Sequence, residues 1–495
     1  MPAPLPPPRI EIAPGLTVPR LLVGLWQVAD MERGGPALDT ERAADALAAY
    51  ADAGFDAFDM ADHYGSAELI VGALRGRARH PALRAFTKWC PTPGSMTTAV
   101  VQAGIDCARR RLGTDCIDLL QFHWWQYSHP GWLDALHALA ERRNRGDIAH
   151  IGLTNFDTDH LRLALKDGIP VATNQVSFSL LDRRAAGRMS AVCIAHGVKL
   201  LAYGALGGGF LSDRWVGQPE PLHIEDWSKS KYRRFIAAVG GWAALQRVLQ
   251  AAHAVAQRHG VSVANVAMRW VLQQPAVGAV IVGARPGERE HRADNRAVFG
   301  FELDERDMRQ LQAALDSTAS LPGDCGDEYR RPPFLTASGD LRHHLDALPP
   351  AYPVVQQAAG RRRVDSGSQW EALAGYARAV RVGNRILVSG TTATQGAGRV
   401  VCPGDAEGQA VHTLDKVQAA IEALGGRMDD VVRTRIWLRD AAAWQGPAEV
   451  HGRRFQDIRP ANTLIGGAQL VGDYEIEVEA DAECAPDDPK EGSPS

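Results

Sequence analysis

The feature that most constrains this chain is a series of eight short apolar runs, separated by longer amphipathic stretches. The runs lie between residues 20 and 317 and are rich in apolar and β-branched side chains. This alternation is typical of parallel strands joined by crossover helices. The expected strands are 20–26, 56–60, 83–89, 117–124, 149–155, 171–178, 199–206 and 278–284.

Eight such units predict an α/β fold of the (β/α)8 TIM-barrel type, because open parallel sheets usually contain fewer strands. A Rossmann fold is disfavoured, since no GxGxxG motif follows the first run. The first long helical segment is expected to be capped by Thr40 and ended by Gly54. In a (β/α)8 barrel, the active site lies at the carboxyl ends of the strands and in the loops after them.

Four polar residues of complementary chemistry fall at this rim. Asp59 ends the second expected strand and Tyr64 lies in the loop after it, while Lys88 and His123 stand at the ends of the third and fourth. A lysine ammonium stabilises a nearby phenolate, and a carboxylate paired with that lysine orients it. Tyr64 is therefore a candidate proton donor to an oxygen that receives hydride. His123 is expected to hydrogen-bond and polarise this oxygen.

Taken singly, such residues have ordinary structural explanations. A lysine after a strand usually lies on the surface, and a histidine in an apolar run is usually a hydrogen-bonded core residue. Tyr203, after the seventh run, is by itself more typical of packing. The joint occurrence of Asp59, Tyr64, Lys88 and His123 at the strand ends of one barrel favours a functional site.

Residues 1–317 resemble the aldo-keto reductases. The resemblance is carried by FDMADHYGSAE, FTKW, LLQFHWW, HIGLTNF, NQVSFSLLDRR, LAYGALGGGFL and IVGARPGEREHRADN. It implies reduction of an aldehyde or ketone to an alcohol, with the family's four catalytic residues at Asp59, Tyr64, Lys88 and His123. Two alternatives stay open: a nicotinamide-binding, redox-sensing regulatory protein, and a dehydrogenase that works in the alcohol-oxidising direction.

The same resemblance implies a nicotinamide cofactor, usually NADPH/NADP with NADH as the other option, bound without a Rossmann fold. It places Asn155 and Gln175 on the carboxamide and Tyr203 on the nicotinamide ring. Arg285 is the candidate for a 2′-phosphate, because a guanidinium matches phosphate oxygens. The other implied cofactor contacts are Trp26, Leu206, Gly207, Gly209, Asp294 and Asn295.

Tryptophans follow several of the expected strands, which favours an aromatic-walled substrate pocket, although several of them are expected to be core. They are Trp26, Trp89, Trp124, Trp125 and Trp132. The segment 210–235 is long for a connecting loop and is expected to fold over the cofactor. The basic residues of this segment either bind the phosphates of the cofactor or lie on a solvent-exposed surface. They are Lys229, Lys231, Arg233 and Arg234.

Beyond residue 317 the pattern changes. Residues 318–352 are expected to form a connector or cap, with Tyr329, Phe334 and Leu335 available to pack on the barrel. Residues 353–486 follow a ββαβαββ-like order, with a hairpin turn at Gly383–Asn384, and predict a separate small α+β domain. Residues 487–495 are expected to be a flexible tail.

Residues 353–485 resemble the Rid/YjgF family through GYARAVRVGNRILVSGTTAT, DVVRTRIWLRD, HGRRFQDIRPANTLIGG and YEIEVEADA. This implies a chorismate-mutase-like fold, trimers with clefts between subunits and, in the active branch, hydrolysis of imines or enamines. That branch carries an arginine where this chain has Asn462, which favours a binding or trimer-forming role over hydrolysis. Glu477 matches the family's acidic position, and Arg433 or Arg435 is a candidate replacement for the arginine.

The net charge and the distribution of cysteines limit the kinds of binding partner to be expected. A net charge of −4 gives no reason to expect nucleic acid or an anionic membrane. The seven cysteines are dispersed without metal-ligand spacing, which suggests reduced thiols and no metal site. Prolines fill the N-terminus where a signal peptide needs an apolar helix. We expect a cytoplasmic enzyme with a small-molecule carbonyl substrate, assembled as a homo-oligomer, a trimer through the second domain.

Overall fold

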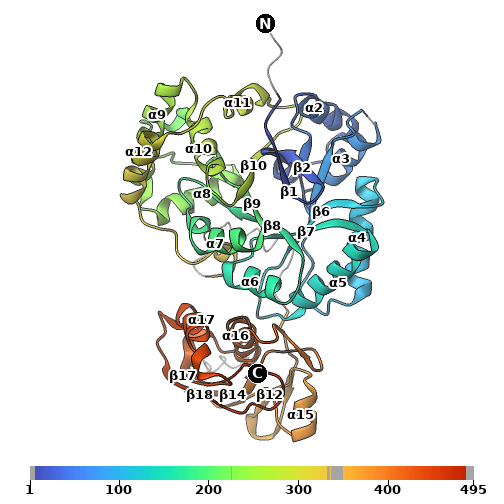
Figure 1. The fold of residues 1–495 in the computed structure, drawn as a ribbon, viewed down its shortest axis with the longest axis vertical. Coiled ribbons are helices and arrows are strands. Elements are labelled where there is room, and N and C mark those ends of the chain that lie inside the picture. Colours follow the sequence, from blue (N-terminus) through green and yellow to red (C-terminus); the bar gives the residue numbers. More distant parts are fainter. Residues whose placement is uncertain (1–5, 78, 225, 332–334, 336–348, 486–495) are drawn as a thin grey trace, which may run out of the picture.

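The computed structural model describes residues 6–77, 79–224, 226–331, 335 and 349–485. Its larger part is a closed barrel of eight parallel strands, which confirms the predicted (β/α)8 fold (Figure 1). The strands, nearly all apolar and buried, are β3 (Leu21–Gly24), β4 (Ala57–Asp59), β5 (Arg84–Trp89), β6 (Ile117–His123), β7 (Ile148–Thr154), β8 (Val171–Ser177), β9 (Lys199–Tyr203) and β10 (Val277–Gly283).

Helices form the outer layer around the barrel, and their apolar faces are buried against the strands. Within the described ranges, none of the helices is long and apolar enough to cross a membrane. The helices of this part are α1 (Trp26–Glu32), α2 (Thr40–Asp52), α3 (Ala67–Gly76), α4 (Thr98–Leu112), α5 (Gly131–Arg145), α6 (Thr158–Lys166), α7 (Arg188–His196), α8 (Trp227–Ala238), α9 (Gly241–His259), α10 (Val263–Leu272), α11 (Arg292–Ala297), α12 (Glu305–Asp316) and α13 (Asp327–Arg330).

Two local expectations are wrong. Helix α2 is capped by Asp39 rather than Thr40, because the Asp39 carboxylate accepts the backbone N–H groups of Glu41 and Arg42. The segment 210–235 is not a continuous loop, since α8 begins at Trp227 with Asp226 as its cap. The amino-terminal part of α8 therefore occupies the end of the segment that was expected to be a long loop.

The amino-terminal end of the barrel is closed by a hairpin that the sequence analysis did not predict. It consists of β1 (Arg9–Ala13) and β2 (Leu16–Pro19), which pair antiparallel. Ile12 and Val18 of the hairpin are buried in one cluster with Phe86 and Leu119 of the barrel strands. The hairpin thus seals the end of the barrel opposite the expected active site.

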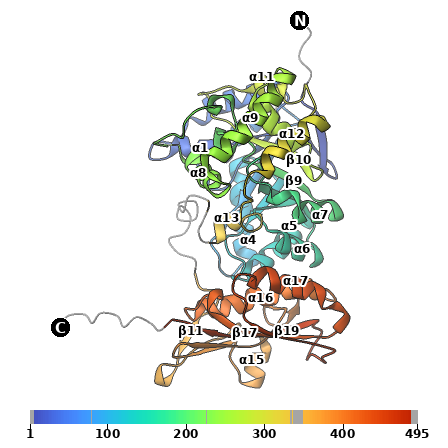
Figure 2. The ribbon, with the colours of Figure 1, turned by 90° about the vertical axis from the view of Figure 1, so that its left-hand side faces the viewer.

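The C-terminal domain is a mixed sheet in the order β11-β12-β13-β14-β19-β17-β18, with its two long helices α16 and α17 on one face (Figure 2). The hairpin turn at Gly383–Asn384 is confirmed, and the structure adds two strands and a helix before it. The elements are β11 (Val354–Gln356), β12 (Arg362–Val364), α15 (Gln369–Ala374), β13 (Ala379–Val382), β14 (Arg385–Thr392), β15 (Thr394–Gln395), β16 (Arg399–Val400), α16 (Ala406–Ala423), β17 (Val431–Leu438), α17 (Gln445–Phe455), β18 (Ala461–Gly466) and β19 (Ile476–Glu483).

Helices α16 and α17 lie between this sheet and the barrel (Figure 2). Ion pairs cross the junction. Arg162 of α6 donates to both oxygens of Asp405, at 2.8 and 2.9 Å. Arg453 of α17 donates to Asp159 at 3.0 Å. The two domains are therefore joined by specific contacts in addition to the connector.

The most buried of these contacts centres on His160. Its ring nitrogens lie 2.7 Å from Asp157 Oδ1 and 2.8 Å from Asp415 Oδ2 of α16. Burial disfavours the imidazolium, but the two carboxylates outweigh burial and raise the pKa of His160 to about 9. The charged ring thus links the barrel to the C-terminal domain at neutral pH.

This linkage predicts a pH dependence of stability. The contribution of His160 is fully present below its unfolded pKa of 6.5 and is lost as the pH rises through about 9. We expect the junction to weaken by on the order of 2–3 kcal/mol from pH 6 to pH 10, and His160→Gln to remove this part of the dependence. Thermal unfolding of both proteins across this range measures the effect. Parallel curves for the two proteins would contradict the assignment.

Candidate active site

A buried ion pair lies at the carboxyl end of the barrel. Lys88 Nζ donates to Asp59 Oδ2 at 2.6 Å and to the Met60 carbonyl oxygen at 3.0 Å. Both side chains of the pair are almost fully buried, at 2% and 4% exposure. Neighbouring parallel strands β4 and β5 carry them, so the barrel closure itself brings the two charges together.

Two amides complete the surroundings of the carboxylate. Gln121 of β6 and Gln175 of β8 donate to Asp59 Oδ1 at 2.8 and 2.7 Å. Gln175 Nε2 also lies 2.7 Å from Gln121 Oε1. Gln175 was expected at the cofactor, whereas Gln121 was not predicted; its signal in the sequence is a polar residue two positions before His123 on an apolar strand.

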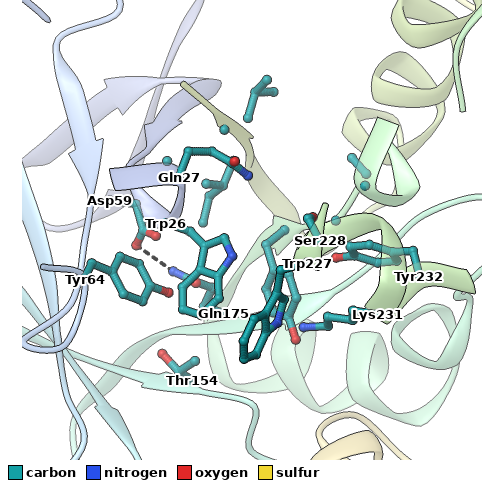
Figure 3. A pocket seen from close by; sticks show the side chains of 18 of the residues that line it. Trp26, Gln27, Asp59, Tyr64, Thr154, Gln175, Trp227, Ser228, Lys231 and Tyr232 are labelled. Carbon is teal, nitrogen blue, oxygen red and sulfur yellow. Dashed lines mark hydrogen bonds between the residues drawn. The ribbon is translucent and has the colours of Figure 1, made fainter. Parts of the chain in front are cut away.

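Tyr64 lies directly beside this pair. Lys88 Nζ is 4.9 Å from the centroid of the Tyr64 ring, and the Trp26 ring packs edge-on against the same tyrosine at 5.0 Å. The tyrosine side chain points into the cavity with its hydroxyl toward Trp26 (Figure 3). Its loop is anchored by Glu32, which accepts from the Ser66 backbone N–H at 2.9 Å and from the Ser66 hydroxyl.

His123, the last residue of β6, is buried at the same rim. Its ring lies 4.3 Å from the ring of Trp125 and 5.9 Å from that of Tyr329. Its Nδ1 atom lies 3.4 Å from Cys90 Sγ, a contact that leaves the opposite edge of the imidazole toward the cavity. The structure therefore brings the four predicted catalytic residues together.

These side chains open into a cavity of about 290 Å³ (Figure 3). Of the five predicted tryptophans, Trp26 and Trp125 line it, whereas Trp89, Trp124 and Trp132 belong to the core. Trp227, at the start of α8, is an aromatic wall that the sequence analysis did not identify, and the Arg33 guanidinium lies 3.8 Å from its ring centroid. The pocket is thus aromatic on two sides, as expected from the sequence.

Residues assigned to the nicotinamide end also reach the cavity. Asn155 has a left-handed backbone (φ 56°), and its side-chain oxygen accepts from the Tyr203 hydroxyl at 2.8 Å. Burial raises the pKa of Tyr203 well above its usual value, so the phenol stays neutral. Leu206 and Gly209 line the cavity, while Gly207 is buried behind them.

The residues assigned to the adenosine end do not line this cavity. Arg285 contacts the carboxylate of Asp30 and lies 3.9 Å from Asp226, which does line the cavity. Asp294 accepts from the Ser262 hydroxyl at 3.2 Å, and Asn295 is buried on α11. The structure therefore brings Arg285 near the cavity rim and leaves the other two further out.

The basic residues of segment 210–235 separate into two groups. Lys231 lines the cavity and donates to the hydroxyl of Tyr329 at 2.6 Å. Lys229 pairs with Asp226, and Arg233 pairs with Glu220; Arg234 is exposed on α8. Tyr329 belongs to the predicted connector, which therefore contributes to the pocket. Of its other expected packing residues, Leu335 is buried, and Phe334 lies outside the described residues.

Three residues close to Tyr64 in the sequence or the fold have side chains of the kind that bind metal ions. Asp62, His63 and Cys90 each offer a ligand atom, all within 4.8 Å of one another. The Asp62 carboxylate, however, already bonds His63 Nδ1 at 2.7 Å through one oxygen and the Cys90 backbone N–H at 2.9 Å through the other. These bonds tie the Tyr64 loop to the end of β5, which is a sufficient structural role for Asp62.

The predicted cleft residues of the C-terminal domain lie apart. Asn462 donates to Thr434 Oγ1 of β17 at 2.9 Å. Glu477 of β19 lies opposite Trp437 in the sheet, which is three residues, or about 10 Å, further along β17 than Thr434. Burial and then the charge of Glu479 raise the pKa of Glu477. Arg433 is exposed, and Arg435 lies 3.2 Å from Glu479 and 3.4 Å from Asp481. Asn462 and Glu477 therefore do not contact each other within a single chain.

The closed barrel and the four polar side chains at its carboxyl rim define a barrel enzyme. Residues 20–316 match the family model described as "Aldo/keto reductase family". This match covers more than half of the chain, so the protein belongs to the aldo/keto reductase family, whose members use NAD(P)H. Residues 367–484 match the model described as "Endoribonuclease L-PSP", which confirms the Rid-type second domain.

Relatives of known name align with the barrel. The aldo-keto reductase YhdN of Bacillus subtilis (strain 168) is 25% identical over 335 residues, covering 64% of this chain and 96% of that protein. Protein tas of Escherichia coli (strain K12) is 32% identical over 225 residues, covering 41% of this chain and 63% of that protein. The solved structure of a glycerol dehydrogenase from Gluconobacter oxydans shares the fold, with a TM-score of 0.54, 24% identity, and coverage of 64% of this chain and 97% of that chain. The family membership supports carbonyl reductase function.

The position of Gln121 leads to a first prediction for the site. Gln121→Leu leaves the buried Asp59 carboxylate with one donor fewer, and we expect kcat/KM for carbonyl reduction to fall about tenfold. Thr87→Val, on the neighbouring strand β5, is the matched control, because it removes a buried hydrogen bond to Glu68 of α3 without touching Asp59. Steady-state kinetics of both variants check this. Equal losses in the two variants would show that Gln121 acts only through stability.

Proposed function

We propose that the barrel reduces an aldehyde or ketone to an alcohol with NADPH, and that Tyr64 is the proton donor. The observation that carries the proposal is the buried Lys88–Asp59 pair directly beside the Tyr64 ring. An ammonium held at this place in a water-poor site stabilises the phenolate that remains after proton transfer. The donors of Gln121 and Gln175 keep the carboxylate, and through it the lysine, in one position.

His123 and the aromatic walls would orient the substrate. The imidazole projects from the end of β6 and is held by the ring of Trp125 on one side. A hydrogen bond from His123 to the carbonyl oxygen would polarise the carbonyl group and direct its oxygen toward Tyr64. Trp26 and Trp227 would cover the rest of an apolar substrate and exclude water.

The cavity wall fits a nicotinamide cofactor. Gly207, Gly208 and Gly209 all have left-handed backbones, and Gly208 and Gly209 line the cavity without side chains, so this wall would let a ligand approach the backbone closely. Tyr203, Asn155 and Gln175 would face the nicotinamide end. When bound, the cofactor supplies the hydride that forms the new C–H bond, and the Tyr64 proton completes the alcohol.

NADPH is proposed over NADH because of Arg285. Its guanidinium lies near the cavity rim, where the adenosine end of the cofactor would bind and a 2′-phosphate would replace the carboxylates of Asp30 and Glu288 as its partner. Asp294 and Asn295 would lie nearby on α11. Substrate identity depends on Tyr329, Trp26 and Trp227, which together enclose the space above the catalytic residues.

For the C-terminal domain we propose assembly of a homo-oligomer, a trimer, rather than imine hydrolysis. One face of its sheet is covered by α16, and the opposite face points away from the barrel (Figure 2). That face exposes apolar side chains such as Leu387 and Ile465, at 39% and 46%, among charged residues of β17 and β19 such as Arg435 and Glu479. Exposed apolar side chains on an uncovered sheet face favour association. The separation of Asn462 from Glu477 and the missing guanidinium argue against a hydrolytic site.

Replacing the proton donor tests the reductase proposal. Tyr64→Phe removes the donor hydroxyl, and we expect kcat to fall by about 10²–10⁴-fold with cofactor affinity unchanged. Tyr50→Phe, a buried tyrosine of α2 outside the site, is the control. The assay follows cofactor oxidation with a panel of aldehydes and ketones. Slow turnover by the parent with every substrate would support the regulatory alternative instead.

Charging the open sheet face tests assembly. Leu387→Asp combined with Ile465→Asp is expected to convert a trimer into monomers of 53.5 kDa, because carboxylates placed beside Asp481 and in the same row as Glu477 would be buried in the interface without cationic partners. Leu222→Asp, an exposed leucine on the barrel side, is the control. Light scattering measures the mass of each protein. A parent that is already monomeric would refute the trimer.

A further inference from the structure

Helix α16 of the C-terminal domain contacts a loop of the reductase barrel through Glu422. Glu422 Oε2 accepts from Gln126 Nε2 at 2.7 Å and from Ser128 Oγ at 2.9 Å. Gln418, one turn earlier on the same helix, donates to the other carboxylate oxygen at 2.7 Å and holds the side chain in place. A carboxylate that accepts two donors from one short loop restricts that loop strongly.

The loop concerned is 124–130, which directly follows His123. Its Trp125 packs on the His123 ring at 4.3 Å, and the Trp124 indole N–H donates to the Gln126 carbonyl oxygen at 2.7 Å. From the connector, Arg330 donates to the Trp124 carbonyl oxygen at 2.9 Å. The side chain that contacts Glu422 is therefore adjacent in sequence to the side chain that packs on His123.

A second carboxylate of α16 holds the next loop of the rim. Asp415, two turns before Glu422, lies 2.8 Å from His160 Nε2 and accepts from Arg454 at 2.7 Å. The ring of Tyr127 stacks on His160 at 3.4 Å between centroids, and its hydroxyl accepts the Asp157 backbone N–H at 3.2 Å. The loops after β6 and β7 are thus joined to each other and to α16.

Open space lies beside these contacts. A cavity of about 510 Å³ separates parts of the barrel rim from the C-terminal domain, and Glu422, His160 and Gln126 all line it. Trp125 and Tyr329 line both this cavity and the catalytic one. If the polar contacts to α16 are removed, the loops have room to shift, because no close-packed apolar interface fills this space.

We propose that Glu422 and Asp415 are positioning residues of the reductase: they hold the loops after β6 and β7 from outside the barrel and so fix His123 and Asn155. The inference rests on the proposed reductase function. It gives the C-terminal domain a role in the barrel's chemistry besides assembly. A shift of about 1 Å in a group that orients substrate lowers rates by up to about 100-fold, so support from a second domain has a measurable effect.

The test compares two carboxylates of the same region. Glu422→Ala is expected to lower kcat/KM for carbonyl reduction about tenfold and to leave cofactor affinity unchanged, and Glu422→Gln to restore part of the loss. Asp405→Ala is the matched control. It removes the bidentate pair with Arg162 at the same domain junction, away from loop 124–130, and is expected to keep kcat/KM within about twofold.

Hydrogen exchange provides a second measurement that does not depend on activity. Amide exchange in residues 124–130 is expected to accelerate in Glu422→Ala and not in Asp405→Ala. Equal kinetics and equal exchange in the two variants would overturn the inference, since Glu422 would then serve the junction alone. If the parent reduces no carbonyl, the proposed function fails, and exchange still decides whether α16 holds the loop.

Discussion

The structure depends on one buried ion pair, that between Lys88 and Asp59. Two opposite charges at 2.6 Å in the barrel interior are stable only if their remaining hydrogen-bonding capacity is satisfied. Gln121, Gln175 and the Met60 carbonyl oxygen meet this requirement. Each of these partners comes from a different strand or strand end. The geometry of the site therefore forms only when the barrel closes. Such a pair serves positioning better than stability.

Much of this site could be predicted from the sequence, because parallel strands end at a common rim. Asp59 and His123 could be placed there from the strand pattern alone. The role of Gln121 could not be predicted in this way, because a single amide in an apolar strand does not indicate which residue it contacts. The helix that begins at Trp227 was also missed, because its short amphipathic pattern follows a proline-rich stretch. Contacts such as Tyr329 in the pocket arise only from tertiary folding.

The two domains share more than a connector. The helical face of the C-terminal sheet meets the barrel, while its open face points away (Figure 2). This arrangement separates two tasks: one face supports the loops that carry catalytic groups, and the other is free for association. The carboxylates of α16 bridge the two domains, because each has one partner on the barrel and one in its own domain: Asp415 contacts His160 and Arg454, and Glu422 contacts Gln126 and Gln418. Sequence resemblance to either family alone does not predict such contacts.

In the proposed reaction, the lysine–aspartate pair makes the phenol of Tyr64 acidic enough to protonate the carbonyl oxygen. The pH dependence of kcat/KM for carbonyl reduction, measured for the parent and for Lys88→Met, tests it most directly. The activity loss at high pH reports ionisation of the proton donor. We expect this loss to move to higher pH in Lys88→Met, toward the ordinary tyrosine value of about 10 or above, with a much lower rate. An unchanged pH profile in the variant would contradict the account.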